Sequence, residues 1–362
     1  MSDDTGYKLR TRGVRKTYGP VVALAGADLE MREGEFLTLL GPSGSGKTTL
    51  LMAIAGLNDP DGGEIWIDGK LATYTPPHDR GLGMVFQSYA LFPHMSIFEN
   101  IAFPLRMRKR DAGTIRKEVA RVLDIVQLPD VASRYPRELS GGQQQRIALA
   151  RCFVYQPAII LMDEPLGALD KKLRDTLQRE VKHLHQNLGI TVLYVTHDQE
   201  EAMVMSDRIC LMNDARIEQV GTPQELYFQP NSVFAADFLG ESNLLPATVI
   251  ESRDGEIVLQ AAGGLTVHGQ ANAALSKGDS VRFMVRPESV KTVAAGTARN
   301  EVQGVIKEVI MSGQITKCFM ELPDGSEMVS SRLTVESGTG LAPGRPVHFG
   351  WSAEHTVVLP DR

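Results

Sequence analysis

Cysteine is scarce in this sequence, and long apolar runs are missing. The three cysteines, Cys152, Cys210 and Cys318, stand alone and far apart, which excludes a disulfide framework and a cysteine-based metal site. Apolar runs such as Ile159–Met162 fall far short of the roughly 20 residues that cross a bilayer. The first residues contain no apolar signal region. These absences predict a soluble, cytoplasmic protein, which can still dock on a membrane protein.

An excess of positive charge is also absent. The formal net charge is −6, so the composition argues against a nucleic-acid-binding or membrane-surface protein. Hydrophobic residues make up 43% of the chain and charged residues 23%, both ordinary values for a globular protein. With 362 residues the chain is too long for one ordinary core, and we expect two or more domains.

The first two thirds of the chain alternate short apolar strands with amphipathic helices. Three apolar runs end in glycine or polar residues: 36–41, 158–164 and 191–198. Near-continuous apolar strands are typical of a parallel sheet that is covered on both faces. Between the last two runs, leucines and valines recur at helical spacing over 173–188, and Gly189 suits the C-terminal cap. A further helix is expected over about 114–126. The pattern predicts an α/β fold.

Beyond about Gly240 the helical periodicity fades and short strand-like runs take over. Turn signals separate these runs, as in RDGE (Arg253–Glu256) and PDGS (Pro323–Ser326). We therefore interpret residues 1–240 as an α/β domain and residues 241–362 as a small all-β domain that is barrel-like.

One glycine-rich stretch carries a strong chemical signal. It reads GPSGSGKTT and matches the pattern G-x-x-x-x-G-K-[ST]. Glycines let backbone N–H groups turn inward around phosphate oxygens, Lys47 reaches the β- and γ-phosphates, and the Thr48 hydroxyl binds Mg²⁺. An apolar strand precedes the stretch, and the helix after it points its positive end at the anion. The predicted ATP-binding residues are Gly41, Pro42, Ser43, Gly44, Ser45, Gly46, Lys47, Thr48 and Thr49.

Three further residues are predicted at the same edge of the sheet. Asp163 follows four apolar residues, at the strand end where ligands bind in open α/β sheets, and is expected to hold Mg²⁺ through water. Glu164 is the candidate to orient or deprotonate the attacking water, although alone it could be a solvated carboxylate. His197 ends the next apolar run and is expected to contact the γ-phosphate.

A second glycine-rich stretch, LSGGQQQR at Leu139–Arg146, contains no lysine. Taken by itself it could be an ordinary loop before a helix. Ser140 can cap a helix that begins near Gly142, and the free N–H groups and positive dipole of that helix would face an anion.

These motifs together resemble the ATP-binding-cassette (ABC) ATPases over residues 1 to about 235. The order is the phosphate loop, LSGGQQQR, LMDEP, Leu169–Asp170 and VTHD. In that family two nucleotide-binding domains dimerise head to tail, and each ATP lies between one subunit's phosphate loop and the other's LSGGQ signature. The resemblance implies a homodimer, and it explains why the signature needs no lysine. It implies that the following residues contact ATP of the second subunit: Ser140, Gly141, Gly142, Gln143 and Asp170.

The same resemblance implies roles for two more residues. Tyr18 matches the aromatic residue that stacks on adenine, although it could also be a strand-edge tyrosine. Gln87 matches the glutamine that touches Mg²⁺ and the attacking water and links to the transmembrane partner. Gly167 stands where the family usually has serine. A helical subdomain is implied over about 88–155, and the aromatic segment 87–103 is expected both to receive a permease helix and to contribute to the core.

The C-terminal domain resembles the oligonucleotide/oligosaccharide-binding (OB) fold regulatory domain of importer ATPases, with VRPESV (Val285–Val290) as the local match. The implied function is ATP hydrolysis to ADP and phosphate at the cytoplasmic face of the inner membrane, with Mg²⁺. The implied partners are two transmembrane permease subunits and, indirectly, an external solute-binding protein. No nucleic acid partner is expected.

The transported solute is not encoded in these motifs, because the ATPase never needs to bind it. Whole-chain likeness is greatest to polyamine-type (spermidine/putrescine) importers. Iron, sulfate, sugar and 2-aminoethylphosphonate systems share the same architecture and remain alternatives. A cassette ATPase of DNA repair would need a long coiled-coil insertion, and one of translation usually has two cassettes; neither feature is present. A mainly regulatory role for the β domain stays open.

Overall fold

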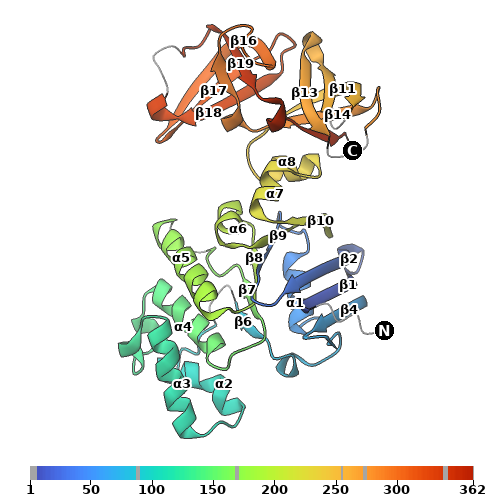
Figure 1. The fold of residues 1–362 in the computed structure, drawn as a ribbon. Coiled ribbons are helices and arrows are strands. Elements are labelled where there is room, and N and C mark those ends of the chain that lie inside the picture. The colour runs from blue at the N-terminus through green and yellow to red at the C-terminus, as the bar shows by residue number, and fades with distance from the viewer. Residues whose placement is uncertain are drawn as a thin grey trace. The chain divides into compact units, whose positions relative to one another are not determined.

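The computed structural model describes residues 6–86, 90–167, 171–253, 256–271, 275–336 and 341–361 (Figure 1). The chain divides into two compact units, the first ending at Pro223 and the second beginning at Gln224. Within the described residues, no helix is both long enough and apolar enough to cross a membrane.

A six-stranded sheet forms the centre of the first unit. Its strand order is β10-β9-β3-β8-β7-β6, and all neighbours are parallel except β10 and β9. The strands are β3 Phe36–Leu40, β6 Gly83–Val85, β7 Ile160–Asp163, β8 Val192–Thr196, β9 Arg208–Asn213 and β10 Arg216–Gly221. Every residue of β3 and β8 is buried, which confirms the prediction from their continuous apolar runs.

Both faces of this sheet are covered, so alternate residues of one strand enter different cores. In β7, Ile160 and Met162 pack into one core, and Leu161 packs into the other. The core that contains Leu161 also includes helix α1 (Lys47–Ala55) and an antiparallel sheet of order β2-β1-β4-β5. The strands of that sheet are β1 Tyr7–Tyr18, β2 Val21–Arg32, β4 Gly62–Ile67 and β5 Lys70–Leu71.

Helices pack on the other face of the sheet. They are α2 Ile97–Met107, α3 Ala112–Ile125, α4 Gly141–Phe153, α5 Lys171–Leu188 and α6 Gln199–Met205. Ser96, Asp111 and Ser140 cap α2, α3 and α4 through their side-chain oxygens. Helices α3 and α5 lie where hydrophobic periodicity predicts them. In the aromatic segment, Leu91 and Phe98 are partly buried against this core.

The second unit contains two short helices and two β structures. The helices are α7 Pro223–Phe228 and α8 Val233–Phe238. A closed five-stranded barrel comprises β11 Asn243–Arg253, β12 Glu256–Ala261, β13 Thr266–Ala271, β14 Ser280–Val285 and β20 Val357–Pro360. A second sheet comprises β15 Lys291–Val293, β16 Asn300–Ser312, β17 Ile315–Glu321, β18 Glu327–Leu333 and β19 Pro346–Trp351. The barrel agrees with the predicted OB-like fold, and one hydrophobic core joins it to the second sheet.

The two units divide after Pro223, the first residue of α7, whereas the sequence pattern suggests a boundary after residue 240. The reason is local packing. Ala236 of α8 packs on Met284, Val357 and Leu359 of the barrel. Buried Arg286 donates hydrogen bonds to the backbone carbonyls of Tyr227 at 2.8 Å and of Ala236 and Gly240 at 3.0 Å each. These contacts attach both short helices to the β unit, and a change in periodicity cannot reveal them.

Candidate active site

The glycine-rich loop connects the buried strand β3 to helix α1. Two of its glycines are required by close packing. A Cβ on Gly41 would lie 2.2 Å from the carbonyl oxygen of Met212, and one on Gly46 would lie 2.4 Å from that of Ala23. Gly44, at φ +83°, faces open space, so its requirement is conformational. Close backbone contacts at Gly41 and Gly46 therefore fix the path of the loop at the start of α1.

Helix α1 begins at Lys47 without a side-chain cap, because its N-cap residue is Gly46. Backbone N–H groups in the first turn of a helix have no partner within the helix, and the helix dipole places positive charge there. An anion in the loop would accept hydrogen bonds from these N–H groups and would be stabilised by the helix dipole. This arrangement is the one that phosphate groups occupy at helix N-termini.

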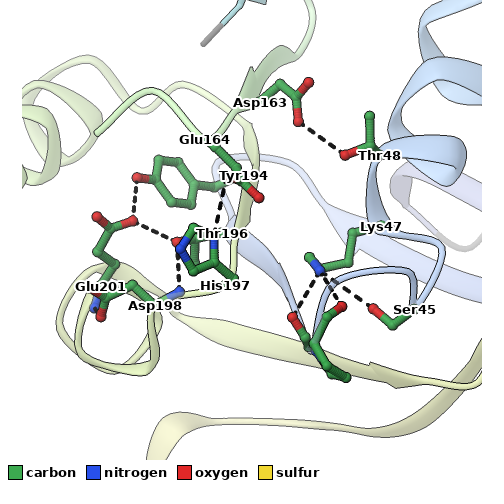
Figure 2. Close-up of polar contacts among 12 residues, drawn as sticks. Ser45, Lys47, Thr48, Asp163, Glu164, Tyr194, Thr196, His197, Asp198 and Glu201 are labelled. Atoms are coloured by element: carbon green, nitrogen blue, oxygen red, sulfur yellow. Dashed lines mark hydrogen bonds and ion pairs between the residues drawn. The ribbon is translucent and has the colours of Figure 1, made fainter. Parts of the chain in front are cut away.

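The side chain of Lys47 turns back onto the loop (Figure 2). Its Nζ donates to the carbonyl oxygens of Gly41 and Pro42 at 2.8 Å each and to Ser45 Oγ at 3.4 Å. Burial lowers the pKa of Lys47, and the nearby carboxylates of Glu164 and Asp163 oppose this shift. A buried ammonium held by neutral carbonyls is suited to receive the negative charge of a phosphate chain.

Thr48 and Asp163 meet across the loop. The Thr48 hydroxyl donates to Asp163 Oδ1 at 3.3 Å, although the two residues lie 115 positions apart in the chain. Asp163 is the last residue of β7, and burial raises the pKa of its carboxyl group. Both oxygens belong to the hard donors that Mg²⁺ prefers. Among the residues described, no group of three or more His, Cys, Asp and Glu side chains forms a metal cluster.

Glu164 and His197 form a pair at the ends of neighbouring strands. His197 Nδ1 lies 3.1 Å from Glu164 Oε2, and the carboxylate is less exposed (24%) than the imidazole (57%). Glu164 has φ +44°, an uncommon conformation for a non-glycine residue, while its N–H bonds to the Val195 carbonyl at 3.0 Å. This turn directs the Glu164 side chain to His197 (Figure 2).

The loop before α1 therefore shares one edge of the sheet with Asp163, Glu164 and His197. The parallel register pairs Leu40 with Thr196 and Asp163 with Val195, so the three strands end at the same level. The other predicted loop residues differ in exposure: Ser43 and Thr48 are exposed, and Thr49 is half-buried. The edge combines a glycine loop with an uncapped helix terminus, an ammonium, two carboxylates and an imidazole.

Tyr18 lies at the end of β1 with 49% of its surface exposed. Lys16 Nζ lies 5.5 Å from the centre of its ring, and the Asn58 side-chain amide donates to its hydroxyl. The exposed ring is available for stacking on a flat aromatic group.

The second glycine-rich stretch begins α4, one residue earlier than the sequence suggests. Ser140 and Gln143 cap each other: the Gln143 N–H donates to Ser140 Oγ at 3.3 Å, and the Ser140 N–H donates to Gln143 Oε1 at 3.0 Å. Gly142 packs against α5, since a Cβ there would lie 3.1 Å from Leu173 Cδ1. Within the described ranges, no hydrogen bond or ion pair connects residues 139–146 to the phosphate loop.

Two predicted residues, Gln87 and Asp170, lie outside the described residues. Conversely, the structure reveals a polar network behind His197 that the sequence analysis missed. Glu201 is buried there and accepts hydrogen bonds from Tyr194 and Thr196. The available signal was faint: two hydroxyl side chains inside an otherwise apolar strand, with a glutamate four residues after the histidine.

Comparisons with known families match both units. The ABC transporter family model matches residues 24–167 of the first unit, and the TOBE domain family model matches residues 283–359 of the second. The spermidine/putrescine import ATP-binding protein PotA of Rubrobacter xylanophilus is 44% identical, covering 97% of this chain and 93% of that protein. The protein of the same name from Escherichia coli K12 is also 44% identical, covering 96% and 93%.

Three solved structures resemble the chain at 28% to 36% identity. A dimeric bacterial ABC transporter cassette is 35% identical with a TM-score of 0.53, covering 59% of this chain and 98% of that one. A dimeric post-hydrolysis cassette bound to ADP and phosphate is 36% identical with a TM-score of 0.53, covering 59% and 98%. The cbiO1 protein of Clostridium perfringens is 28% identical with a TM-score of 0.58, covering 61% and 91%.

Replacing Lys47 by methionine is expected to weaken ATP binding by about 100-fold, because the glycine loop would lose the Lys47 ammonium while the loop backbone stays in place. Fluorescent-nucleotide titration of the purified chain measures this. Lys70→Met is the matched control, since Lys70 is exposed on β5. Equal affinity of the Lys47 and Lys70 variants would contradict the assignment of the glycine loop to phosphate binding.

Proposed function

The chain belongs to the ATP-binding proteins of ABC transporters, and we propose that it powers the import of polyamines, with spermidine and putrescine as the solutes. Its enzymatic activity is the hydrolysis of ATP to ADP and phosphate. The observation that carries the ATPase assignment is the shared sheet edge, where Lys47, the Thr48–Asp163 pair and the Glu164–His197 pair lie beside the glycine loop. The solute rests on the similarity to spermidine/putrescine import ATP-binding proteins.

ATP binding begins with the triphosphate in the loop Gly41–Thr49. The uncapped N–H groups of α1 bind phosphate oxygens, and Lys47 exchanges its bonds with the Gly41 and Pro42 carbonyls for the β- and γ-phosphates. The adenine stacks on the exposed ring of Tyr18.

The residues at this edge fit Mg²⁺. The Thr48 hydroxyl and the Asp163 carboxylate already lie within hydrogen-bonding distance of each other, and both would hold the ion, Asp163 through water. Gln87 joins them on the strength of the family resemblance. When bound with ATP, the ion supplies positive charge to the β- and γ-phosphates.

Hydrolysis requires a water molecule aligned with the bond between the β- and γ-phosphates. Glu164 accepts a proton from that water as its oxygen attacks the γ-phosphorus, and the bond to the oxygen of ADP breaks. His197 contacts the γ-phosphate and holds the Glu164 carboxylate in place through the 3.1 Å pair.

We infer that a second copy completes the γ-phosphate site with its signature, residues Ser140–Gln143, and with Asp170. The reciprocal cap of Ser140 and Gln143 presents the start of α4 as a second anion-binding helix terminus, and no lysine is needed there. The similarity to two dimeric cassette structures supports this homodimer.

The same proposal places the chain at the cytoplasmic face of the membrane, bound to two transmembrane permease subunits and supplied by an external solute-binding protein. The relatives that carry the spermidine/putrescine import name align with 96% or more of this chain. The net charge of −6 gives no reason to expect a nucleic acid partner.

Glu164→Gln is expected to leave ATP affinity within about threefold of wild type and to lower the hydrolysis rate by about 100-fold or more, because the amide cannot accept the proton. The dimer should then persist with ATP, which size-exclusion chromatography detects. Turnover near the wild-type rate in this variant would remove Glu164 from the catalytic role.

The solute is tested by reconstituting the complete transporter with its binding protein in liposomes and measuring phosphate release. Spermidine or putrescine should stimulate ATP hydrolysis, whereas ferric iron, sulfate, maltose and 2-aminoethylphosphonate should not. Stimulation by one of the latter group alone would contradict the polyamine assignment and leave the ATPase assignment intact.

A further inference from the structure

A buried carboxylate lies directly behind the candidate catalytic pair. Glu201 is in the first turn of α6 and only 2% exposed. One of its oxygens, Oε2, accepts two hydrogen bonds, from the Tyr194 hydroxyl at 2.8 Å and from the Thr196 hydroxyl at 2.7 Å. Both donors belong to β8, the strand that ends immediately before His197 (Figure 2).

The hydrogen bonds continue past His197 on its other side. Thr196 Oγ1 accepts from the Asp198 N–H at 3.0 Å. The Asp198 side chain caps α6 by accepting from the N–H groups of Glu200 at 2.8 Å and of Glu201 at 3.2 Å. Thr196, the residue before His197, therefore bonds directly to Glu201. Asp198, the residue after His197, is connected to Glu201 through the Thr196 hydroxyl.

Arg174 of α5 supplies the positive charge of this network. Its Nη1 lies 2.9 Å from Asp198 Oδ2, and its Nε lies 3.8 Å from Glu201 Oε1. Burial raises the pKa of Glu201, and the hydrogen bonds from Thr196 and Tyr194 oppose that shift. A buried carboxylate destabilises a fold unless it is paired and hydrogen-bonded. Two of the partners of Glu201 also contact Asp198, the residue after His197: Thr196 through its hydroxyl and Arg174 through its guanidinium.

We propose that Glu201 is a positioning residue for ATP hydrolysis: with Thr196 and Asp198 it fixes the turn at His197 so that the imidazole faces Glu164. The proposal rests on the proposed function of Glu164 and His197. His197 itself is 57% exposed and makes its described polar side-chain contact only with Glu164, so its own surroundings restrain it weakly. Most of the restraint on its orientation must come from the backbone on either side.

An alternative is that the network only stabilises α6. That alternative predicts a loss of stability without a selective effect on turnover. A positioning role predicts instead a selective loss of turnover. The turnover number falls because His197 is misplaced, whereas ATP affinity is kept because Lys47 and the glycine loop still contact ATP. A displacement of about 1 Å at a catalytic group can lower a rate by about 100-fold.

The central experiment compares Glu201→Met with Glu201→Gln and Glu200→Met in the purified full-length chain. Glu201→Met keeps the side-chain length but removes both acceptors, and we expect kcat to fall by about 10- to 100-fold with KM for ATP within threefold. Glu201→Gln retains one carbonyl acceptor and should lose less. Glu200→Met is the matched control, because Glu200 is the neighbouring residue with a 63% exposed side chain. A kcat for Glu201→Met within twofold of wild type would overturn the proposal.

A second pair of variants tests the same relay without removing a buried charge. Thr196→Val is nearly isosteric but lacks the hydroxyl that joins Glu201 to the Asp198 N–H, whereas Thr196→Ser keeps it. We expect Thr196→Val to show the low kcat of Glu201→Met and Thr196→Ser to keep a kcat near that of the wild type. Equal rates for the two variants would contradict the relay.

A double-mutant cycle shows whether the effect passes through His197. In a His197→Ala background, Glu201→Met should cause no further loss of residual turnover. The ¹³Cε1 resonance of His197, assigned by its absence in His197→Gln, should move in Glu201→Met and not in Glu200→Met. Independent, additive losses would overturn the proposal. A wild-type chain that hydrolyses no ATP would instead refute the proposed function.

Discussion

The register of three parallel strands is the constraint on which the whole site depends. Leu40 of β3 pairs with Thr196 of β8, and Val195 of β8 pairs with Asp163 of β7. The chain therefore leaves three strands at one level, with a glycine loop, an Asp-Glu pair and a histidine at their ends. A shift of one residue in either pairing would turn buried side chains to the wrong face of the sheet, so the two cores hold the register. The catalytic geometry follows from the packing of the apolar residues beneath it.

Two regions of the chain, the phosphate loop and the start of α4, differ in their electrostatics. The phosphate loop concentrates positive charge, with one ammonium and an uncapped helix terminus beside two carboxylates. The start of α4 offers a helix terminus without a lysine, and its Ser140–Gln143 cap fixes that terminus in the single chain. In our proposal each region is half of a site. ATP would join the two halves of different subunits, so that binding energy from the γ-phosphate drives dimer closure.

Much of the fold could be predicted from local patterns. Continuous apolar strands, helical spacing in α3 and α5, and turn signals beyond Gly240 depend on neighbours in the sequence, and the structure confirms the α/β unit and the barrel. Features that depend on tertiary contacts could not be predicted. Arg286 attaches α7 and α8 to the β unit, and Gly142 is a glycine partly because Leu173 packs against it. The sequence suggests that Glu201 is an exposed helix residue. Its burial becomes evident only in the structure, where the Tyr194 and Thr196 hydroxyls donate hydrogen bonds to it.

The composite site is tested most directly by mixing two inactive chains, Ser140→Arg and Lys47→Met. A heterodimer of these chains contains one intact site, from the loop of the first chain and the signature of the second, and one site with both halves damaged. The account predicts ATP hydrolysis in the mixture well above that of either parent alone, with circular dichroism confirming that Ser140→Arg keeps its fold despite the lost helix cap. Hydrolysis by Ser140→Arg alone at the wild-type rate would contradict the account, since the signature would then contribute nothing to catalysis.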